Sequence, residues 1–364
     1  MTPLGADLPH VWQRLLNGDK GSPETISGPL SDDTFPVFRV PPEAISKALT
    51  HPRLRRSSAI SRYAVVAGLA ALAGAKVALS AESAARTAII FAISNGGVLY
   101  TKRFYHDVVE SGAQAASPLL FPETVFNAPA SHLAAILGIN GASYTLVGDG
   151  AIGILAIKMA SDLMLDPTLD RCLVVGAEEA DWLLCDAYRR WRLLSKEPPI
   201  RPFEKRNRGF IMSEGAGAIL IDRAGPTILE KIDSGCNFHR QSEAAACVDE
   251  VFERLGGNDC DLVVASANGT FVDSAEQSAI RKHCPETRVY APKAALGESV
   301  GAGAIWQVIC AAMSLGTQEL PPARNGRGER PSEPRVGDSK IRRAIVSSCG
   351  MNQQVAGLSL IRAE

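Results

Sequence analysis

The stretch RPFEKRNRGFIMSEGAGAILID, residues 201–222, passes from a charged segment into an apolar run and is the most informative for the fold. Its apolar end, residues 217–221, predicts a strand, and the turn-forming pair Gly225 and Pro226 follows it. Similar apolar runs and Ala- and Leu-rich helical patterns alternate along the chain. The runs lie at 87–93, 171–175, 262–265 and 343–346, and the helical patterns at 63–79, 152–165 and 302–315. This alternation predicts an α/β protein with a largely parallel sheet that is covered by helices on both faces.

Composition excludes several function classes. The chain has 364 residues, 46% of them hydrophobic, and a net charge of −1, which is typical of a globular protein and gives no overall field for nucleic acid. Its eight cysteines show no metal-ligand spacing, so we expect buried free thiols in a reducing compartment and no metal site. No signal peptide is recognisable, and the apolar segment 64–79 is better explained as a buried helix than as a membrane span. A cytoplasmic location is therefore expected.

Three glycine-rich frames carry the functional information. They are GASYTLVGDGAIG at 141–153, ANGT at 267–270 and KAALGESVGAGA at 293–304. They resemble the nucleophile turn and the two histidine loops of the β-ketoacyl-acyl-carrier-protein synthases, a family of the thiolase superfamily. By this resemblance Gly150 stands where the family has its cysteine, and Asn268 and Glu298 stand where it has its two histidines.

The resemblance extends over nearly the whole chain. The stretch 201–222 is similar to the family's signature, and SSCGMNQQVAGLSL at 347–360 is similar to its terminal glycine-rich loop, with Met351 in place of a gating phenylalanine. It implies a five-layer α-β-α-β-α fold built from two similar βαβαβ halves, residues 1–225 and 226–364. It also implies a dimer formed through a strand near the nucleophile turn. One departure concerns the first family strand, because TPLG directly follows Met1 here: either that strand is absent or the start is misassigned.

The three substitutions remove the chemistry that the family uses. A cysteine at a helix N-terminus readily forms the thiolate that accepts the acyl chain, and Gly150 has no side chain to replace it. Asn268 can donate a hydrogen bond but cannot shuttle protons near neutral pH. Glu298, if ionised, would repel the enolate that the family's histidine stabilises. We therefore expect no condensation by this chain alone.

Other residues of the three frames allow more than one role. Lys293 and Glu276 match family positions and could form an ion pair or network with Glu298. The backbone N–H groups of Gly150 and Met351 match the family's oxyanion donors and could still bind a carbonyl oxygen or a water.

Two further side chains near these frames also remain open. Asp149 is expected to cap the helix that begins near Ala151, or else to pair with Glu298 for acid–base work. Cys349 is either a buried inert thiol or a substitute nucleophile.

Two main hypotheses follow. In the first, the chain is a chain-length-factor-type subunit that pairs with an active ketosynthase and shapes its acyl tunnel. The segments 101–109 and 121–127 would then lie at the dimer seam, where Phe104, Tyr105 and Phe126 could close the tunnel, although a core role for the aromatic side chains is an equal alternative.

In the second hypothesis, the chain is a repurposed homodimeric enzyme that acts on an acyl-thioester through Glu298 and Asn268. A scaffold or acyl-binding regulator is a third possibility.

Either of two basic clusters could dock an acidic carrier protein. The clusters are Arg53, Arg55 and Arg56, and Lys196, Arg201, Lys205, Arg206 and Arg208. No cofactor motif is recognisable.

Overall fold

The computed structural model describes residues 1–29, 33–46, 51–204, 209–325 and 340–363. The helices are α1 (Leu8–Leu16), α2 (Pro42–Ser46), α3 (Ala59–Gly74), α4 (Ala81–Ala85), α5 (Val98–Ser111), α6 (Ala128–Leu137), α7 (Ile152–Leu163), α8 (Trp182–Arg190), α9 (Ala244–Leu255), α10 (Phe271–His283), α11 (Lys293–Leu296) and α12 (Gly303–Thr317). The strands are β1 (Pro23–Ser27), β2 (Thr34–Phe38), β3 (Thr87–Ile93), β4 (Ser143–Val147), β5 (Arg171–Glu178), β6 (Met212–Ser213), β7 (Gly215–Asp222), β8 (Thr227–Asn237), β9 (Leu262–Val264), β10 (Arg288–Tyr290), β11 (Arg324–Asn325), β12 (Arg343–Cys349) and β13 (Gln354–Arg362). Each predicted apolar run lies within a strand or overlaps one.

Two large sheets organise the molecule. The first has the strand order β4-β3-β5-β7, and the second has the order β11-β10-β9-β12-β13-β8. In each sheet three neighbouring strands are parallel: β4, β3 and β5 in the first, and β10, β9 and β12 in the second. The remaining strands, β7, β11, β13 and β8, pair antiparallel. The prediction of largely parallel pairing is therefore right for three strands of each sheet and wrong for the others.

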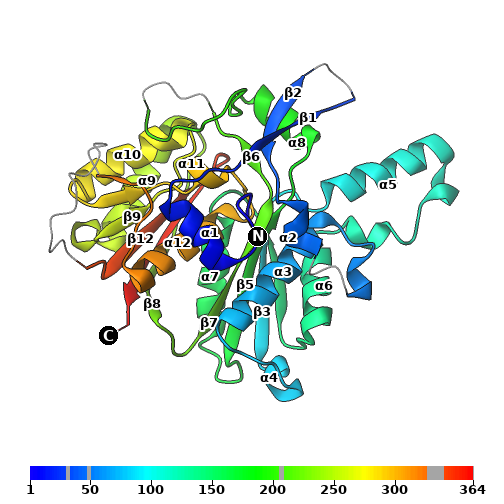
Figure 1. Cartoon of the computed structure of the whole chain (residues 1–364), viewed down its shortest axis with the longest axis horizontal. Coiled ribbons are helices and arrows are strands. Elements are labelled where there is room, and N and C mark those ends of the chain that lie inside the picture. Colours follow the sequence, from blue (N-terminus) through cyan, green and yellow to red (C-terminus); the bar gives the residue numbers. More distant parts are fainter. Residues whose placement is uncertain (30–32, 47–50, 205–208, 326–339, 364) are drawn as a thin grey trace.

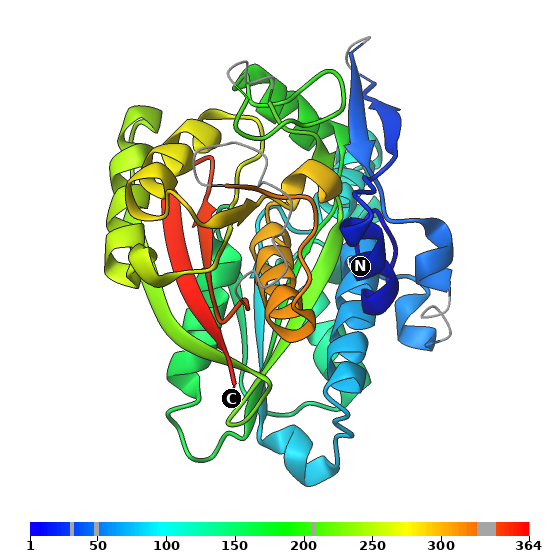
Figure 2. The same cartoon turned by 60° about the vertical axis from the view of Figure 1, so that its left-hand side comes forward.

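The helices stack with these sheets in five layers. Helices α3 and α6 contact the first sheet, α7 and α12 lie between the two sheets, and α9 and α10 contact the second sheet. Figures 1 and 2 show the same order of layers, with α12 and α7 at the centre. This confirms the α-β-α-β-α architecture. Gly153 allows the central helices to approach closely, since a Cβ there would lie 2.9 Å from the Cβ of Ala304.

Helix α3 differs from its predicted range of 63–79. It begins earlier because the Ser58 side chain accepts a hydrogen bond from the Ser61 N–H and caps the helix there. It ends at Gly74, and Lys76 follows with a φ of 55°, a left-handed conformation that closes the helix.

Strand β7 has a sheet neighbour on one edge only. On its other edge, Met1 exchanges two backbone hydrogen bonds with Ala216, and no other described strand pairs there. The antiparallel strand β13 of the second sheet has β8 at the corresponding edge. The described residues therefore contain no counterpart of β8 in the first sheet.

Helix α5 forms an arm that projects from the body together with the segment up to residue 127 (Figure 1). No residue of α5 is buried. The arm carries six exposed large hydrophobic side chains, namely Tyr105, Val109, Leu119, Phe121, Val125 and Phe126. Phe104 is half-buried, and its ring contacts those of Tyr105 and Phe121 at centroid distances of 6.1 and 5.7 Å. A core role for these aromatic residues within this chain is therefore wrong.

None of the described helices is long and apolar enough to cross a bilayer.

Candidate functional site

Gly150 lies buried in the turn between β4 and α7. A Cβ at this position would lie 3.2 Å from the Cα of Gly350, which is tighter than most side chains tolerate. The Ser348 hydroxyl also donates to the Gly150 carbonyl at 3.0 Å. The turn is thus packed directly onto the terminal glycine-rich loop, and it presents no reactive side chain at the start of the central helix.

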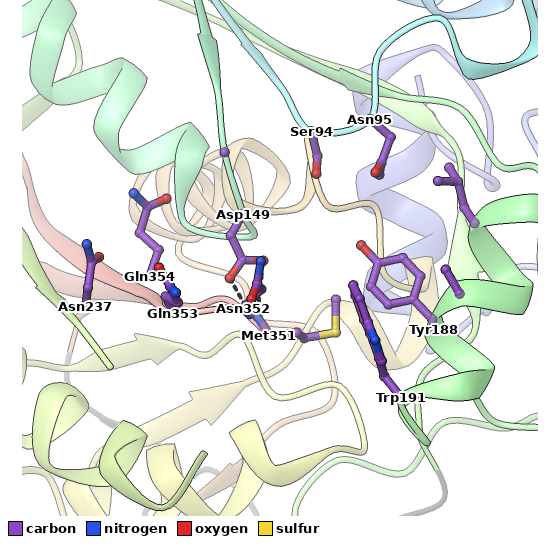
Figure 3. A pocket seen from close by; sticks show the side chains of 13 residues that line it. Ser94, Asn95, Asp149, Tyr188, Trp191, Asn237, Met351, Asn352, Gln353 and Gln354 are labelled. Carbon is purple, nitrogen blue, oxygen red and sulfur yellow. Dashed lines mark hydrogen bonds between the residues drawn. The ribbon is translucent and has the colours of Figure 1, made fainter. Parts of the chain in front are cut away.

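Asp149 binds that loop rather than the helix. Its carboxylate accepts hydrogen bonds from the backbone N–H groups of Met351 at 3.2 Å and Asn352 at 2.6 Å (Figure 3). Helix α7 begins without a side-chain cap, so the predicted capping role is wrong. The carboxylate can reach these donors because Gly350 has no side chain: a Cβ there would collide with it.

A second prediction also fails here. The Met351 N–H was expected to be available to a carbonyl oxygen or a water, and it is bonded to Asp149 instead. Asp149 binds the Met351 and Asn352 N–H groups, whereas Glu298 binds Asn268 and Lys293, and no described hydrogen bond joins the two carboxylates.

A cavity of about 400 Å³ opens beside Asp149. Five carboxamide side chains line it, namely Asn95, Asn237, Asn352, Gln353 and Gln354. Asp149 is the only described lining residue with a carboxylate, and none of the described lining residues carries a basic group. The rings of Tyr188 and Trp191 stand edge to face on the opposite side at 5.7 Å (Figure 3). Burial raises the pKa of Tyr188 above its usual value, and the nearby carboxylates of Glu178, Asp149 and Glu298 raise it further.

Asn268, Lys293 and Glu298 form a buried cluster. The Lys293 ammonium lies 2.7 Å from Oε2 of Glu298, and both side chains are 2% exposed. The Asn268 amide donates to the same oxygen at 2.6 Å. The Thr270 hydroxyl donates to the Asn268 carbonyl oxygen at 2.7 Å and so fixes the orientation of the amide. The predicted Lys293–Glu298 ion pair is confirmed, and all three side chains are held by one another.

Glu276 does not join this cluster through a hydrogen bond. Its Oε1 atom accepts from the Ser266 N–H, the Ser266 hydroxyl and the Ser347 hydroxyl. The expected network with Glu298 therefore reaches Glu276 through the charge of Lys293, which lowers the pKa of Glu276, and not through a hydrogen bond. Burial raises the pKa of Glu276 from 4.5 to about 7, against the lowering effect of these hydrogen bonds and of Lys293.

The raised pKa of Glu276 makes stability depend on pH. The folded chain holds this proton more tightly than the unfolded chain, whose pKa is near 4.5. The resulting stabilisation is therefore complete below pH 4.5 and is lost as the pH rises through about 7, by at most about 1.4 kcal/mol per pH unit. Glu276→Gln keeps the acceptor oxygen and mimics the protonated acid. We expect it to flatten the fall in unfolding free energy over this range.

Urea unfolding at a series of pH values measures this effect. The slope should decrease without vanishing, because burial also raises the pKa of Glu178 to about 7 and of Glu179 to about 8. The exposed Glu253→Gln serves as the control. An unchanged slope in Glu276→Gln would show that this carboxyl is not protonated in the folded state.

Cys349 has the properties of an inert thiol. Its side chain is buried, and its sulfur contacts the Gly350 carbonyl at 3.5 Å. Burial, followed by the charges of Glu276 and Asp149, raises the pKa of the thiol well above its usual value. Because the thiolate is the nucleophilic form, these surroundings favour the inert alternative. All eight cysteines are free thiols, as expected, and seven of them are buried.

Some functional features were missed or lie outside the description. The aromatic pair Tyr188 and Trp191 was not predicted, and only their spacing of three residues on one helix face could have suggested it.

The described residues contain no group of His, Cys, Asp or Glu side chains that could hold a metal ion. Arg53, Arg55 and Arg56 are exposed, whereas Lys205, Arg206 and Arg208 lie outside the described residues.

Comparison with known proteins gives consistent matches over the whole chain. Residues 1–226 match the family model "Beta-ketoacyl synthase, N-terminal domain", and residues 233–327 match the model "Beta-ketoacyl synthase, C-terminal domain". The chain is 23% identical to the 3-oxoacyl-[acyl-carrier-protein] synthase 2 of Vibrio cholerae, over 89% of this chain and 86% of that protein.

Two of the similar solved structures are described as containing a ketosynthase and a chain length factor. The ishigamide ketosynthase/chain length factor aligns with a TM-score of 0.84 and 19% identity, over 100% of this chain and 97% of that one. The ketosynthase ApeO in complex with its chain length factor ApeC, from Xenorhabdus doucetiae, aligns with a TM-score of 0.76 and 18% identity, over 100% and 96%. At these identities the alignments establish a common fold.

Proposed function

The chain belongs to the β-ketoacyl synthase family, and we propose that it acts there as a non-condensing subunit of the chain-length-factor type. In this role it pairs with a cysteine-bearing synthase and shapes the tunnel that receives the growing acyl chain. The partner carries out the condensation.

The turn at Gly150 carries this proposal. Acyl transfer to a synthase needs a nucleophile at the start of the central helix, and Gly150 supplies none. The nearby Cys349 is a buried thiol with a raised pKa and cannot substitute for it.

The buried cluster supports the same conclusion. Asn268 and Lys293 hold Glu298 by hydrogen bonds of 2.6 and 2.7 Å, and Thr270 holds Asn268. None of these groups can move a proton without separating a buried ion pair, which costs several kcal/mol. An acid–base role for Glu298 in a repurposed enzyme is disfavoured for this reason.

Two exposed apolar surfaces offer places for the partner. Strand β4 pairs with β3 on one edge only, and its Tyr144 and Val147 side chains are 42% and 51% exposed. The arm around α5 exposes the six hydrophobic side chains described above. Contiguous exposed apolar surface of this kind is typical of association sites. Phe104, Tyr105 and Phe126 on the arm are proposed to reach the tunnel of the assembled dimer.

The solved structures with this fold include pairs of a ketosynthase and its chain length factor, which supports a heterodimer.

An acidic carrier protein is a further proposed partner. The exposed arginines Arg53, Arg55 and Arg56 provide a basic docking surface for it.

Co-expression tests the pairing directly. The chain should be produced together with a cysteine-bearing synthase from a neighbouring gene, purified through a tag on one partner, and weighed by native mass spectrometry. We expect a one-to-one heterodimer that forms β-ketoacyl products, and no condensation by this chain alone. A stable homodimer that persists in the presence of the synthase would contradict the proposal, as would acylation of this chain.

A further inference from the structure

We propose that the terminal glycine loop, residues 350–352, is a carboxylate-binding site whose ligand in this chain is its own Asp149 side chain. The inference stands independently of the proposed partner role, because it concerns only the contacts between this loop and the turn before α7. Asp149 acts as a built-in occupant that keeps free acids out of the cavity.

The loop has the structure of an anion site. Two successive backbone N–H groups, those of Met351 and Asn352, point at the two oxygens of one carboxylate. Successive N–H groups in a turn form concave sites that favour anions, and hydrogen bonds to an ionised acceptor are about twice as strong as neutral ones. Asp149 lies 202 positions before Met351 and 203 positions before Asn352, so local turn formation does not explain the contact.

The donors are held in place without the carboxylate. The loop connects β12 to β13, which pair antiparallel along their length. The Gly350 N–H donates to the Gln354 carbonyl at 2.7 Å, and the Gln353 carbonyl accepts from the Phe238 N–H at 2.9 Å. Only a glycine at position 350 leaves room for a carboxylate, since a Cβ would overlap it. The site is thus preorganised and has the space that an acid requires.

The occupant determines what the cavity accepts. Among the residues that the structure describes, Asp149 is its only lining carboxylate, and no lysine or arginine of that part of the chain lines it to offset the charge. A second acid would meet a like charge and occupied donors. Removing Asp149 leaves two aligned N–H groups at the wall of a cavity of about 400 Å³, which can accept a small carboxylate from solution.

Chemical rescue tests the inference. In Asp149→Ala, sodium acetate should restore the missing carboxylate and raise the thermal midpoint by several degrees, since a ligand that binds only the folded state stabilises it. Sodium chloride at the same ionic strength should have no comparable effect. In the unchanged protein, acetate should not act, because the donors are occupied. Asp149→Asn keeps one acceptor oxygen and should respond less than the alanine variant.

Asp166→Ala is the matched control. Its carboxylate also accepts a backbone N–H, that of Thr168 at 2.8 Å, but Asp166 is exposed and does not line the cavity beside Asp149. Acetate should therefore not rescue it. If Asp149→Ala folds only in part, the variant is refolded in sodium acetate and in sodium chloride, and the two yields of folded protein are compared. Equal responses in acetate and chloride, or rescue of Asp166→Ala to the same degree, would overturn the proposal.

Discussion

Lys293→Met is expected to lower the free energy of unfolding by roughly 3–5 kcal/mol, because it breaks a buried ion pair and leaves one charge behind. Glu298 is 1% exposed, and its Oε1 atom already lacks a hydrogen-bond partner. After the substitution only the Asn268 amide would still face the Glu298 carboxylate. Methionine keeps most of the side-chain volume, so the loss of stability measures the effect of the unpaired charge and not that of a cavity.

Urea unfolding near neutral pH measures this loss. Lys158→Met is the matched control, because Lys158 pairs with Asp162 at 2.6 Å but their side chains are 37% and 57% exposed. An exposed pair of this kind contributes about 0.5 kcal/mol. In the double variant Lys293→Met with Glu298→Gln, part of the stability should return, since no charge remains buried. Equal losses in the two lysine variants would contradict the buried ion pair.

Tyr144→Glu is expected to weaken binding to the synthase partner by at least about 100-fold, which corresponds to about 2.7 kcal/mol. Tyr144 lies on β4, the strand whose outer edge has no described neighbour, and its side chain is 42% exposed. A carboxylate placed there would lose its hydration when a partner strand covers it, which is costly for an unpaired charge. The isolated chain should keep its stability within about 0.5 kcal/mol, because the position is at the surface.

Titration of the tagged synthase with each variant gives the dissociation constants. Leu165→Glu is the control, since Leu165 is 82% exposed and lies after α7, away from the residues assigned to the seam. It should bind as the unchanged chain does. Unchanged binding by Tyr144→Glu would remove β4 from the interface and leave the α5 arm as the candidate surface.

The strands and central helices could be predicted because their patterns are local. An apolar run such as 87–93 can bury both faces only inside a sheet, and it forms β3 with all seven residues buried. The pairing of Lys293 with Glu298 was expected from the family resemblance, which placed both residues in one frame, because a buried charge costs several kcal/mol unless it is paired.

The family resemblance could be read from the order of the motifs. It placed Gly150, Asn268 and Glu298 in one region, and the structure adds the contacts that Asn268 and Glu298 make there. It did not reveal that the aromatic side chains of the arm, such as Tyr105, lie outside the core. Exposure of this kind depends on which elements pack together, and no local pattern records it.

The sequence by itself determined segments with a strong local pattern, such as β3 and α7, and that position 150, after Asp149, carries no nucleophile. Only the tertiary structure decided what Asp149 binds, because its partners Met351 and Asn352 lie about 200 residues further along the chain. A short carboxylate at a helix start can bond the helix or any other donor that folding brings near. Gly350 leaves room for the carboxylate to reach the loop N–H groups, and this contact depends on distances that exist only in the folded chain.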